Sequence, residues 1–208
     1  MSAPATTAPK AAAPSDWVMR WRQAWARPGC TALDLACGSG RHVRMLSSAG
    51  AQVTGVDRDA AALAGLRTLP GVQLIEADIE AGPWPLQDRR FDVVVVTNYL
   101  WRPLFDRIKA AVAPGGWLIY ETFTDGQQTI GRPARREFLL RPGELLAMCA
   151  DLRVVAFEDG FAGGPPPPGC EAAPVNGRYV QRVAAVRDAG LADGVWPQYQ
   201  LDPAPGQG

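Results

Sequence analysis

The residues with the clearest capacity for chemistry form a glycine-rich turn at positions 34–41, which reads Asp-Leu-Ala-Cys-Gly-Ser-Gly-Arg. Gly38 and Gly40 lack a Cβ atom, so the chain can turn sharply there and its backbone can approach a ligand closely. The helix expected after the turn would present unpaired N–H groups to a polar or anionic part of that ligand. Many nucleotide-binding α/β domains contain such a turn, so further residues must define the site.

Two aspartates follow the turn at informative positions. Asp57 lies about 17 residues after Gly40, at the end of an expected strand, where a carboxylate can accept hydrogen bonds from ribose hydroxyls. Asp78 follows the next expected strand, where it can meet the amino group of an adenine while Ile79 lies on the ring face. The alternative is that these two aspartates, like Asp34, only cap a loop or a helix.

Alternating strands and helices must position these residues. Apolar strands are expected at 31–36, 51–56, 72–75, 91–96 and 117–121, with helices at 41–49, 59–69 and 103–112. A later helix at 143–150 and strands at 152–157 and 179–186 follow. This order predicts an α/β fold of the Rossmann-like, doubly wound type, with a mostly parallel seven-stranded sheet and helices on both faces. In such sheets ligands bind at the carboxyl ends of the strands.

The remaining segments frame one domain over residues 15–190. Residues 1–14 are expected to form a flexible Ala/Pro-rich tail, and residues 191–208 a C-terminal tail that Trp196 and Tyr199 anchor. Residues 15–27 predict an amphipathic helix that either packs its tryptophans on the domain or covers a ligand pocket. The Gly- and Pro-rich run at 163–168 predicts a long loop.

Composition limits the classes of function. The 208 residues include 21 basic and 21 acidic side chains, a formal net charge of zero, so no broad basic surface for nucleic acid or anionic membranes is expected. A single histidine and four scattered cysteines offer no metal-ligand spacing. Without an apolar segment of signal-peptide or membrane-spanning length, a cytoplasmic location is expected.

Several segments together resemble one enzyme superfamily. LDLACGSGRHVRML, TGVDRD and EADIE, in this order, are similar to the nucleotide-site motifs of class I S-adenosylmethionine-dependent methyltransferases. FDVVVVTNYLWRP and LFDRIKAAVAPGGWLIYETF resemble the later strands of the same family, so the likeness extends over residues 31–123. Within the superfamily, the compact chain is most similar to small bacterial tellurite-resistance-type methyltransferases.

The resemblance implies that S-adenosylmethionine is the cofactor and gives roles to individual positions. Gly38 and Gly40 would lie along its methionine part, and Asp34 would organise the turn and the amino group. Asp57 would bind the ribose, and Asp78 and Ile79 the adenine. The complete expected cofactor site comprises Asp34, Ala36, Gly38, Gly40, Asp57, Arg58, Asp78, Ile79 and Asn98.

Two residues are the candidates for direct roles in catalysis. Tyr99 follows the fourth strand and would line the path between methyl donor and acceptor, where an aromatic ring can contact a cationic centre. His42 is the only histidine, and a role as general base is one hypothesis. The opposing interpretation is that His42 packs in the first helical turn, where the helix N-terminus disfavours its charged form.

The acceptor is expected to be a small molecule that offers a thiol, an oxyanion or another heteroatom. Alternatives are a protein methyltransferase or a catalytically silent partner that binds S-adenosylmethionine. A nicotinamide dehydrogenase is disfavoured because Val43 stands where its third loop glycine would be. Residues 124–141 are the expected substrate cap, and their arginines form a solvated face, an anion clamp or a partner surface. A monomer or a homodimer is expected.

Overall fold

A computed structural model describes residues 12–164, 177–190, 194 and 197–201. The strands are β1 (Thr31–Leu35), β2 (Gln52–Asp57), β3 (Val72–Glu76), β4 (Phe91–Thr97), β5 (Val112–Phe123), β6 (Arg153–Gly163) and β7 (Gly177–Val186). The helices are α1 (Asp16–Arg20), α2 (Arg41–Ser48), α3 (Ala60–Ala64), α4 (Phe105–Ala110) and α5 (Glu144–Met148). Short 3-10 turns are η1 (Arg22–Ala24), η2 (Arg102–Leu104), η3 (Gln127–Thr129) and η4 (Arg136–Phe138).

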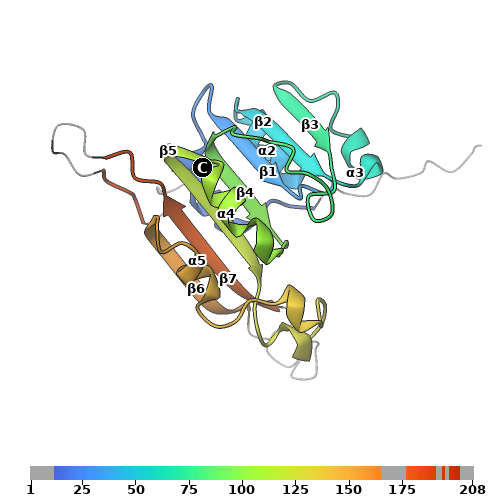
Figure 1. Ribbon diagram of the computed structural model, residues 1–208, viewed down its shortest axis with the longest axis vertical. Coiled ribbons are helices and arrows are strands. Elements are labelled where there is room, and N and C mark those ends of the chain that lie inside the picture. The colour runs from blue at the N-terminus through green and yellow to red at the C-terminus, as the bar shows by residue number, and fades with distance from the viewer. Residues whose placement is uncertain (1–11, 165–176, 191–193, 195–196, 202–208) are drawn as a thin grey trace, which may run out of the picture.

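The strands form a single seven-stranded sheet in the order β3-β2-β1-β4-β5-β7-β6 (Figure 1). Strands β1 to β5 pair in parallel, and β7 runs antiparallel to both β5 and β6. The predicted doubly wound, mostly parallel sheet is therefore confirmed. Its strand order reverses between β1 and β4, and the carboxyl ends beside that point are where such sheets bind ligands.

Side chains of the central strand β4 alternate between two hydrophobic cores. Val94 and Val96 pack with α4 and α5 on one face, whereas Val93 and Val95 pack with α1, α2 and the α3 region on the other. Both sets are completely buried, as expected for a parallel strand covered on both faces. The prediction of helices on both faces is confirmed, and α4 and α5 overlie the sheet in Figure 1.

The N-terminal segment is less helical than the predicted span of 15–27. The α-helix ends at Arg20 because Trp21 leaves the helical region of backbone space, with φ −95° and ψ 32°, and the turn η1 follows. Trp17, Trp21 and Trp25 are all buried, and the Trp21 ring lies 5.8 Å from the Trp117 ring of β5. The tryptophan stripe therefore packs the segment onto the sheet.

Three further elements differ from the predicted ranges. Strand β6 extends to Gly163, beyond the strand expected at 152–157, and so takes in a glycine that was assigned to the long loop. The helix expected at 59–69 is only α3, which Asp59 caps by accepting hydrogen bonds from the N–H groups of Ala61 and Ala62 at 2.9 and 3.1 Å. Strand β5 begins before the expected turn at 113–116, and its register with β4 shifts there. A Cβ atom on Gly116 would lie 2.8 Å from the Ala113 carbonyl oxygen, so this irregular stretch requires glycine.

The described part of the C-terminal segment lies against the N-terminal one. The Tyr199 ring meets the Trp117 ring edge-on at 5.3 Å, and the Gln200 N–H donates to Gln23 at 3.2 Å. Most of the predicted N-terminal tail, the four prolines at 165–168 and Trp196 lie outside the described residues. Within the described ranges, no helix has the length and apolarity to cross a bilayer, and no group of side chains is arranged to hold a metal ion.

Candidate functional site

The glycine-rich turn connects β1 to α2 and has an unusual backbone. Ala36, Gly38 and Gly40 all have positive φ angles, of 54°, 53° and 75°. A Cβ atom on Gly40 would lie 2.3 Å from the Leu66 side chain, so this position needs glycine for packing. A Cβ on Gly38 would meet nothing within 4 Å, so open space borders the turn where the sequence predicts the cofactor.

Asp57, the last residue of β2, holds this turn in place. Its Oδ2 accepts a hydrogen bond of 2.7 Å from the N–H of Gly38, and its Oδ1 accepts one of 2.9 Å from the N–H of Asp59. Each carboxylate oxygen has a further lone pair, so Asp57 can still accept from ribose hydroxyls. Asp57 thus connects the turn to the predicted nucleoside site.

A cavity of about 200 Å³ lies at the carboxyl ends of these strands. It brings together six of the predicted site residues, namely Ala36, Asp57, Arg58, Asp78, Ile79 and Tyr99. Its other lining residues are Ala77 and Glu80. Pockets that enclose a whole ligand usually measure about 300–1,000 Å³, so this cavity suits one part of a ligand, such as a nucleoside. Sequence reasoning missed Glu80, although it is the last residue of the EADIE segment.

Asp78 combines the capping role and the binding role that the sequence left open. Its Oδ1 accepts from the N–H groups of Glu80 and Ala81 at 2.9 and 3.1 Å, and these bonds hold the pKa of the carboxyl below its usual value. No hydrogen bond within the described part of the chain engages Oδ2. An ionised Asp78 therefore presents a free acceptor beside Ile79, as an adenine amino group requires.

Asp34 gives the sharpest test of whether S-adenosylmethionine fits. Its side chain is buried, and among the described residues its Oδ2 has no hydrogen-bond partner. Burial raises its pKa to about 7, although the Arg41 guanidinium and the Val43 N–H oppose the rise. A buried carboxylate with one unpartnered oxygen is costly and favours a cationic neighbour. The ammonium group of the cofactor's methionine part has that charge, so the residues fit the group.

The Tyr99 ring lines the same cavity. Its hydroxyl is buried with no hydrogen-bond partner in the described ranges. Burial, followed by the nearby Glu80 carboxylate, raises the pKa of Tyr99 above its ordinary value. Its backbone oxygen accepts from the Tyr120 hydroxyl at 2.9 Å, which fixes the residue at the end of β4. Tyr99 is therefore a neutral hydroxyl donor at the cavity wall.

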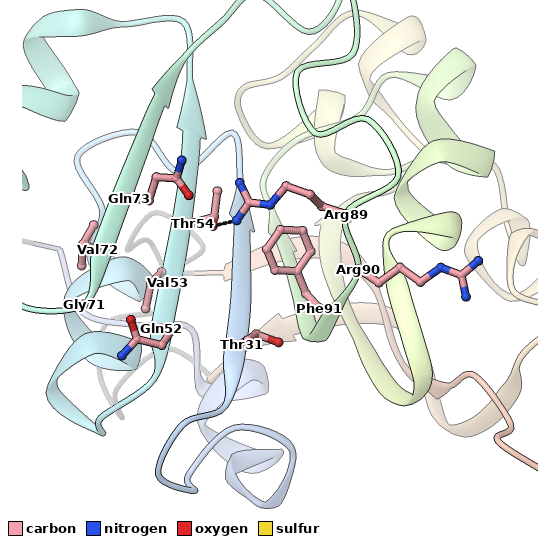
Figure 2. Close-up of a pocket in the computed structure, with 10 residues that line it drawn as sticks. All are labelled: Thr31, Gln52, Val53, Thr54, Gly71, Val72, Gln73, Arg89, Arg90 and Phe91. Carbon is pink, nitrogen blue, oxygen red and sulfur yellow. Dashed lines mark hydrogen bonds between the residues drawn. The ribbon is translucent and has the colours of Figure 1, made fainter.

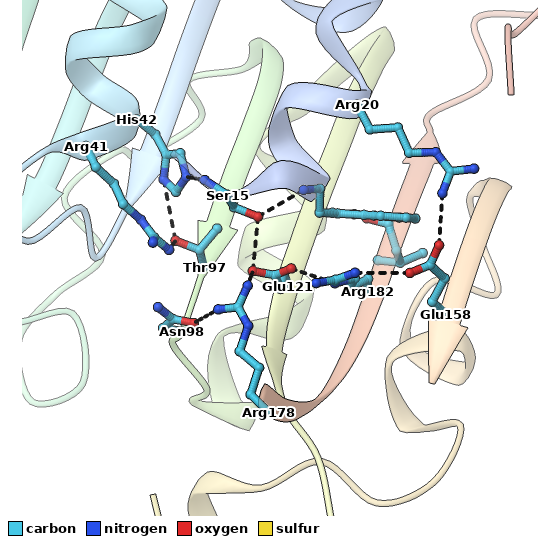
Figure 3. Close-up of polar contacts among 12 residues, drawn as sticks. Ser15, Arg20, Arg41, His42, Thr97, Asn98, Glu121, Glu158, Arg178 and Arg182 are labelled. Carbon is cyan, nitrogen blue, oxygen red and sulfur yellow. Dashed lines mark hydrogen bonds and ion pairs between the residues drawn. The ribbon is translucent and has the colours of Figure 1, made fainter. Parts of the chain in front are cut away.

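His42 and Asn98 lie outside this cavity. The Nε2 atom of His42 accepts a hydrogen bond of 3.0 Å from the N–H of Ser15, and burial lowers the pKa of His42 to about 3 (Figure 3). Such an imidazole is a weak base whose acceptor nitrogen is already engaged, so the geometry favours the packing role. Asn98 has a φ of 54°, and its Oδ1 lies 3.5 Å from Nη1 of Arg178.

A larger hollow of about 440 Å³ lies at the opposite, amino end of the strands (Figure 2). Thr31, Gln52 and Phe91 line it, and Arg89 crosses it to donate to Thr54 Oγ1 at 2.9 Å. It contains none of the predicted site residues. Because open α/β sheets bind ligands at the carboxyl ends, the smaller cavity is the candidate active site despite its size.

Comparison with known proteins identifies the domain. Residues 32–116 match the methyltransferase domain family, whereas a comparison with curated proteins found no significant match. TehB from Haemophilus influenzae is similar at 21% identity with a TM-score of 0.63, over 83% of this chain and 62% of the TehB chain. This chain therefore spans less than two thirds of TehB.

Other solved structures share the fold. An S-adenosylmethionine-dependent methyltransferase from Aquifex aeolicus is 18% identical, with a TM-score of 0.57 over 82% of this chain and 87% of that one. One from Mesorhizobium loti is 20% identical, with a TM-score of 0.58 over 76% of this chain and 91% of that one. These likenesses support the fold, and the domain match covers the turn, both aspartates and the first four strands. Residues 32–116 therefore match a methyltransferase domain, within the fold that these S-adenosylmethionine-dependent methyltransferases share.

Proposed function

We propose that the enzyme transfers the methyl group of S-adenosylmethionine to a small-molecule acceptor. The observation that carries this proposal is the position of Ser15 over the carboxyl ends of the central strands. Its N–H donates to Nε2 of His42 on α2, and its hydroxyl donates to Oε1 of Glu121 on β5 at 3.0 Å (Figure 3). The N-terminal segment thus bridges α2 and β5.

We infer that a segment bound across these strand ends favours a compact acceptor over a folded protein. The zero net charge also offers no broad electrostatic surface for an extended charged partner. The predicted substrate cap contacts β7, where Gln127 of η3 accepts a hydrogen bond from the Tyr179 N–H at 2.9 Å. At least one arginine of this segment is already in an ion pair, because Arg135 pairs with Glu137.

The chemistry places modest demands on the protein. The cofactor's sulfonium supplies an activated methyl group, so the chain must mainly bind and orient. Asp57, Asp78 and Asp34 would hold the ribose, adenine and ammonium parts through the acceptor atoms described above. Correct placement of the acceptor alone is worth about 7–11 kcal/mol of the barrier. A soft acceptor such as a thiolate then needs no strong base, consistent with the engaged, weakly basic His42.

Formation of S-adenosylhomocysteine tests this proposal. The purified enzyme would be incubated with S-adenosylmethionine and separate panels of small thiols, oxyanions and amines, beside a panel of unfolded and folded proteins. We expect turnover with members of a small-molecule panel only. Turnover with the protein panel alone would favour a protein methyltransferase, and tight cofactor binding without turnover in any panel would favour a silent binding partner.

A further inference from the structure

A chain of alternating charges runs from β5 across β7 and β6 to α1 (Figure 3). Glu121 is completely buried. Its Oε1 lies 2.8 Å from Nη2 of Arg178, and its Oε2 lies 2.6 Å from Nε of Arg182. Arg182 also pairs with Glu158 at 3.2 Å, and Glu158 pairs with Arg20 at 2.9 Å. Three arginines therefore share two carboxylates, which leaves one positive charge in excess.

Arg178 is the end of this chain that has donor capacity to spare. Its Nη2 is bound to Glu121, but its Nη1 has only the 3.5 Å contact with Asn98, at the outer limit of a hydrogen bond. Its side chain is 29% exposed, in contrast to the fully buried Glu121. A guanidinium held on one edge and open on the other is prepared to bind an anion.

The position of Arg178 relates it to methyl transfer. Glu121 pairs in register with Thr97 on β4 and with Arg182 on β7, so these residues lie side by side near the carboxyl ends of β4 and β5. Asn98 and Tyr99 follow Thr97 directly: Tyr99 lines the cofactor cavity, while Asn98 turns to Arg178. The left-handed backbone of Asn98 places these consecutive side chains on different sides of the strand end.

We propose that Arg178 binds an anionic group, a carboxylate or an oxyanion, of the methyl acceptor. This inference rests on the proposed function and names the acceptor class of that same site. Glu121 is the positioning residue, because it fixes one edge of the guanidinium and leaves the other edge for the acceptor. Ser15, which donates to the same oxygen of Glu121, closes the site from the N-terminal side.

The test is a calorimetric titration of the full chain saturated with S-adenosylhomocysteine. Sodium acetate and sodium sulfate are the probes for the two anion types, and acetamide is the neutral match of acetate, all at constant ionic strength. Arg178→Gln removes the charge, and Arg178→Lys retains it without the planar fork. Arg27→Gln is the matched control, since Arg27 is 54% exposed and pairs with Asp92 at the amino end of the sheet.

We expect at least one anion to bind the wild type and Arg27→Gln saturably, and acetamide to bind neither. Arg178→Gln should bind that anion about tenfold more weakly or worse, because a charge-assisted hydrogen bond is lost, with an unchanged affinity for S-adenosylhomocysteine. The anion affinity of Arg178→Lys should lie between those of the wild type and Arg178→Gln. This variant also tests the role of Arg178 if Arg178→Gln does not fold. Equal anion affinity in all variants, or none in the wild type, would overturn the proposal. Failure of S-adenosylhomocysteine to bind the wild type would instead count against the proposed function. The same anion titrations of the ligand-free wild type and variants would then decide whether Arg178 binds the anion.

Discussion

The Oδ2 atom of Asp57 lies 2.7 Å from the backbone nitrogen of Gly38, so the residue that ends β2 also holds the turn that ends β1. The family resemblance assigns the ribose of the cofactor to Asp57 and its methionine part to Gly38. One hydrogen bond therefore links the two halves of the site before any ligand binds. Loss of Asp57 should disturb both halves at once.

Asp57→Ala should weaken binding of S-adenosylhomocysteine by roughly 2–3 kcal/mol, because hydrogen bonds to a charged acceptor are lost on the ligand and on the turn. Calorimetry of the purified variant measures this change. Asp59→Ala is the matched control: it removes the cap of α3, which costs about 1 kcal/mol of stability, and should leave the affinity near the wild-type value. Equal affinities of Asp57→Ala and wild type would remove Asp57 from the site.

Gly38 and Gly40 should respond differently to alanine. Both have positive φ angles, so each substitution costs about 1–2 kcal/mol of stability from backbone strain. Gly40→Ala adds a collision with Leu66, worth roughly 1–3 kcal/mol more. Gly38→Ala projects its methyl group into open space, so its main effect should be weaker cofactor binding.

Urea unfolding and calorimetry on both glycine variants separate these effects. Gly40→Ala should lose more unfolding free energy than Gly38→Ala. Gly38→Ala should lose more affinity for S-adenosylhomocysteine relative to its loss of unfolding free energy. The reverse order would place the cofactor on the other side of the turn.

The Asp34 carboxyl should make the stability of the cofactor-free enzyme depend on pH. Its pKa rises from 3.8 to about 7 on folding, so the folded state binds a proton that the unfolded state has released. Its contribution is therefore fully present below about pH 4 and is lost as the pH rises to about 7. The difference in unfolding free energy between the wild type and Asp34→Asn isolates it from other titrating groups.

Relative to Asp34→Asn, the wild type should lose stability across this pH window by an amount on the order of a few kcal/mol. Bound S-adenosylmethionine should reduce that loss, because its ammonium group stabilises the ionised carboxylate. A pH-independent difference between the two proteins would show that Asp34 is ionised throughout.

His42 should stay neutral over the physiological range. Burial lowers its pKa to about 3, so its imidazole carries no proton on the acceptor nitrogen above that pH. Because the chain has one histidine, its ring resonances in an NMR titration of untagged protein are unambiguous. They should not move between about pH 5 and pH 8, where an unperturbed histidine titrates. A midpoint near 6.5 would restore His42 as a candidate general base.

The sequence predicted the parts of the fold that local patterns determine. The β-branched run of β4 indicated a strand buried on both faces, and the spacing of Asp57 and Asp78 placed both at the cavity that the structure contains. The break at Trp21 was not predicted, because helical spacing of tryptophans does not reveal the 3-10 turn that packs them against β5.

The network around Glu121 could not be predicted for a different reason. Arg178 and Arg182 meet Glu121 only because β7 inserts antiparallel between β5 and β6. No local pattern specifies that long-range pairing. Similarly, the sequence identified Asn98 as a cofactor contact, whereas its left-handed backbone directs it to Arg178.

Calorimetric titration of the wild-type protein with S-adenosylhomocysteine, with NADH as the comparison ligand, shows whether the cavity binds the adenosyl cofactor. We expect saturable one-site binding of S-adenosylhomocysteine, weakened in Asp57→Ala, and no binding of NADH. Absence of binding by the adenosyl ligand, or equal binding of NADH, would contradict the assignment of this cavity to S-adenosylmethionine.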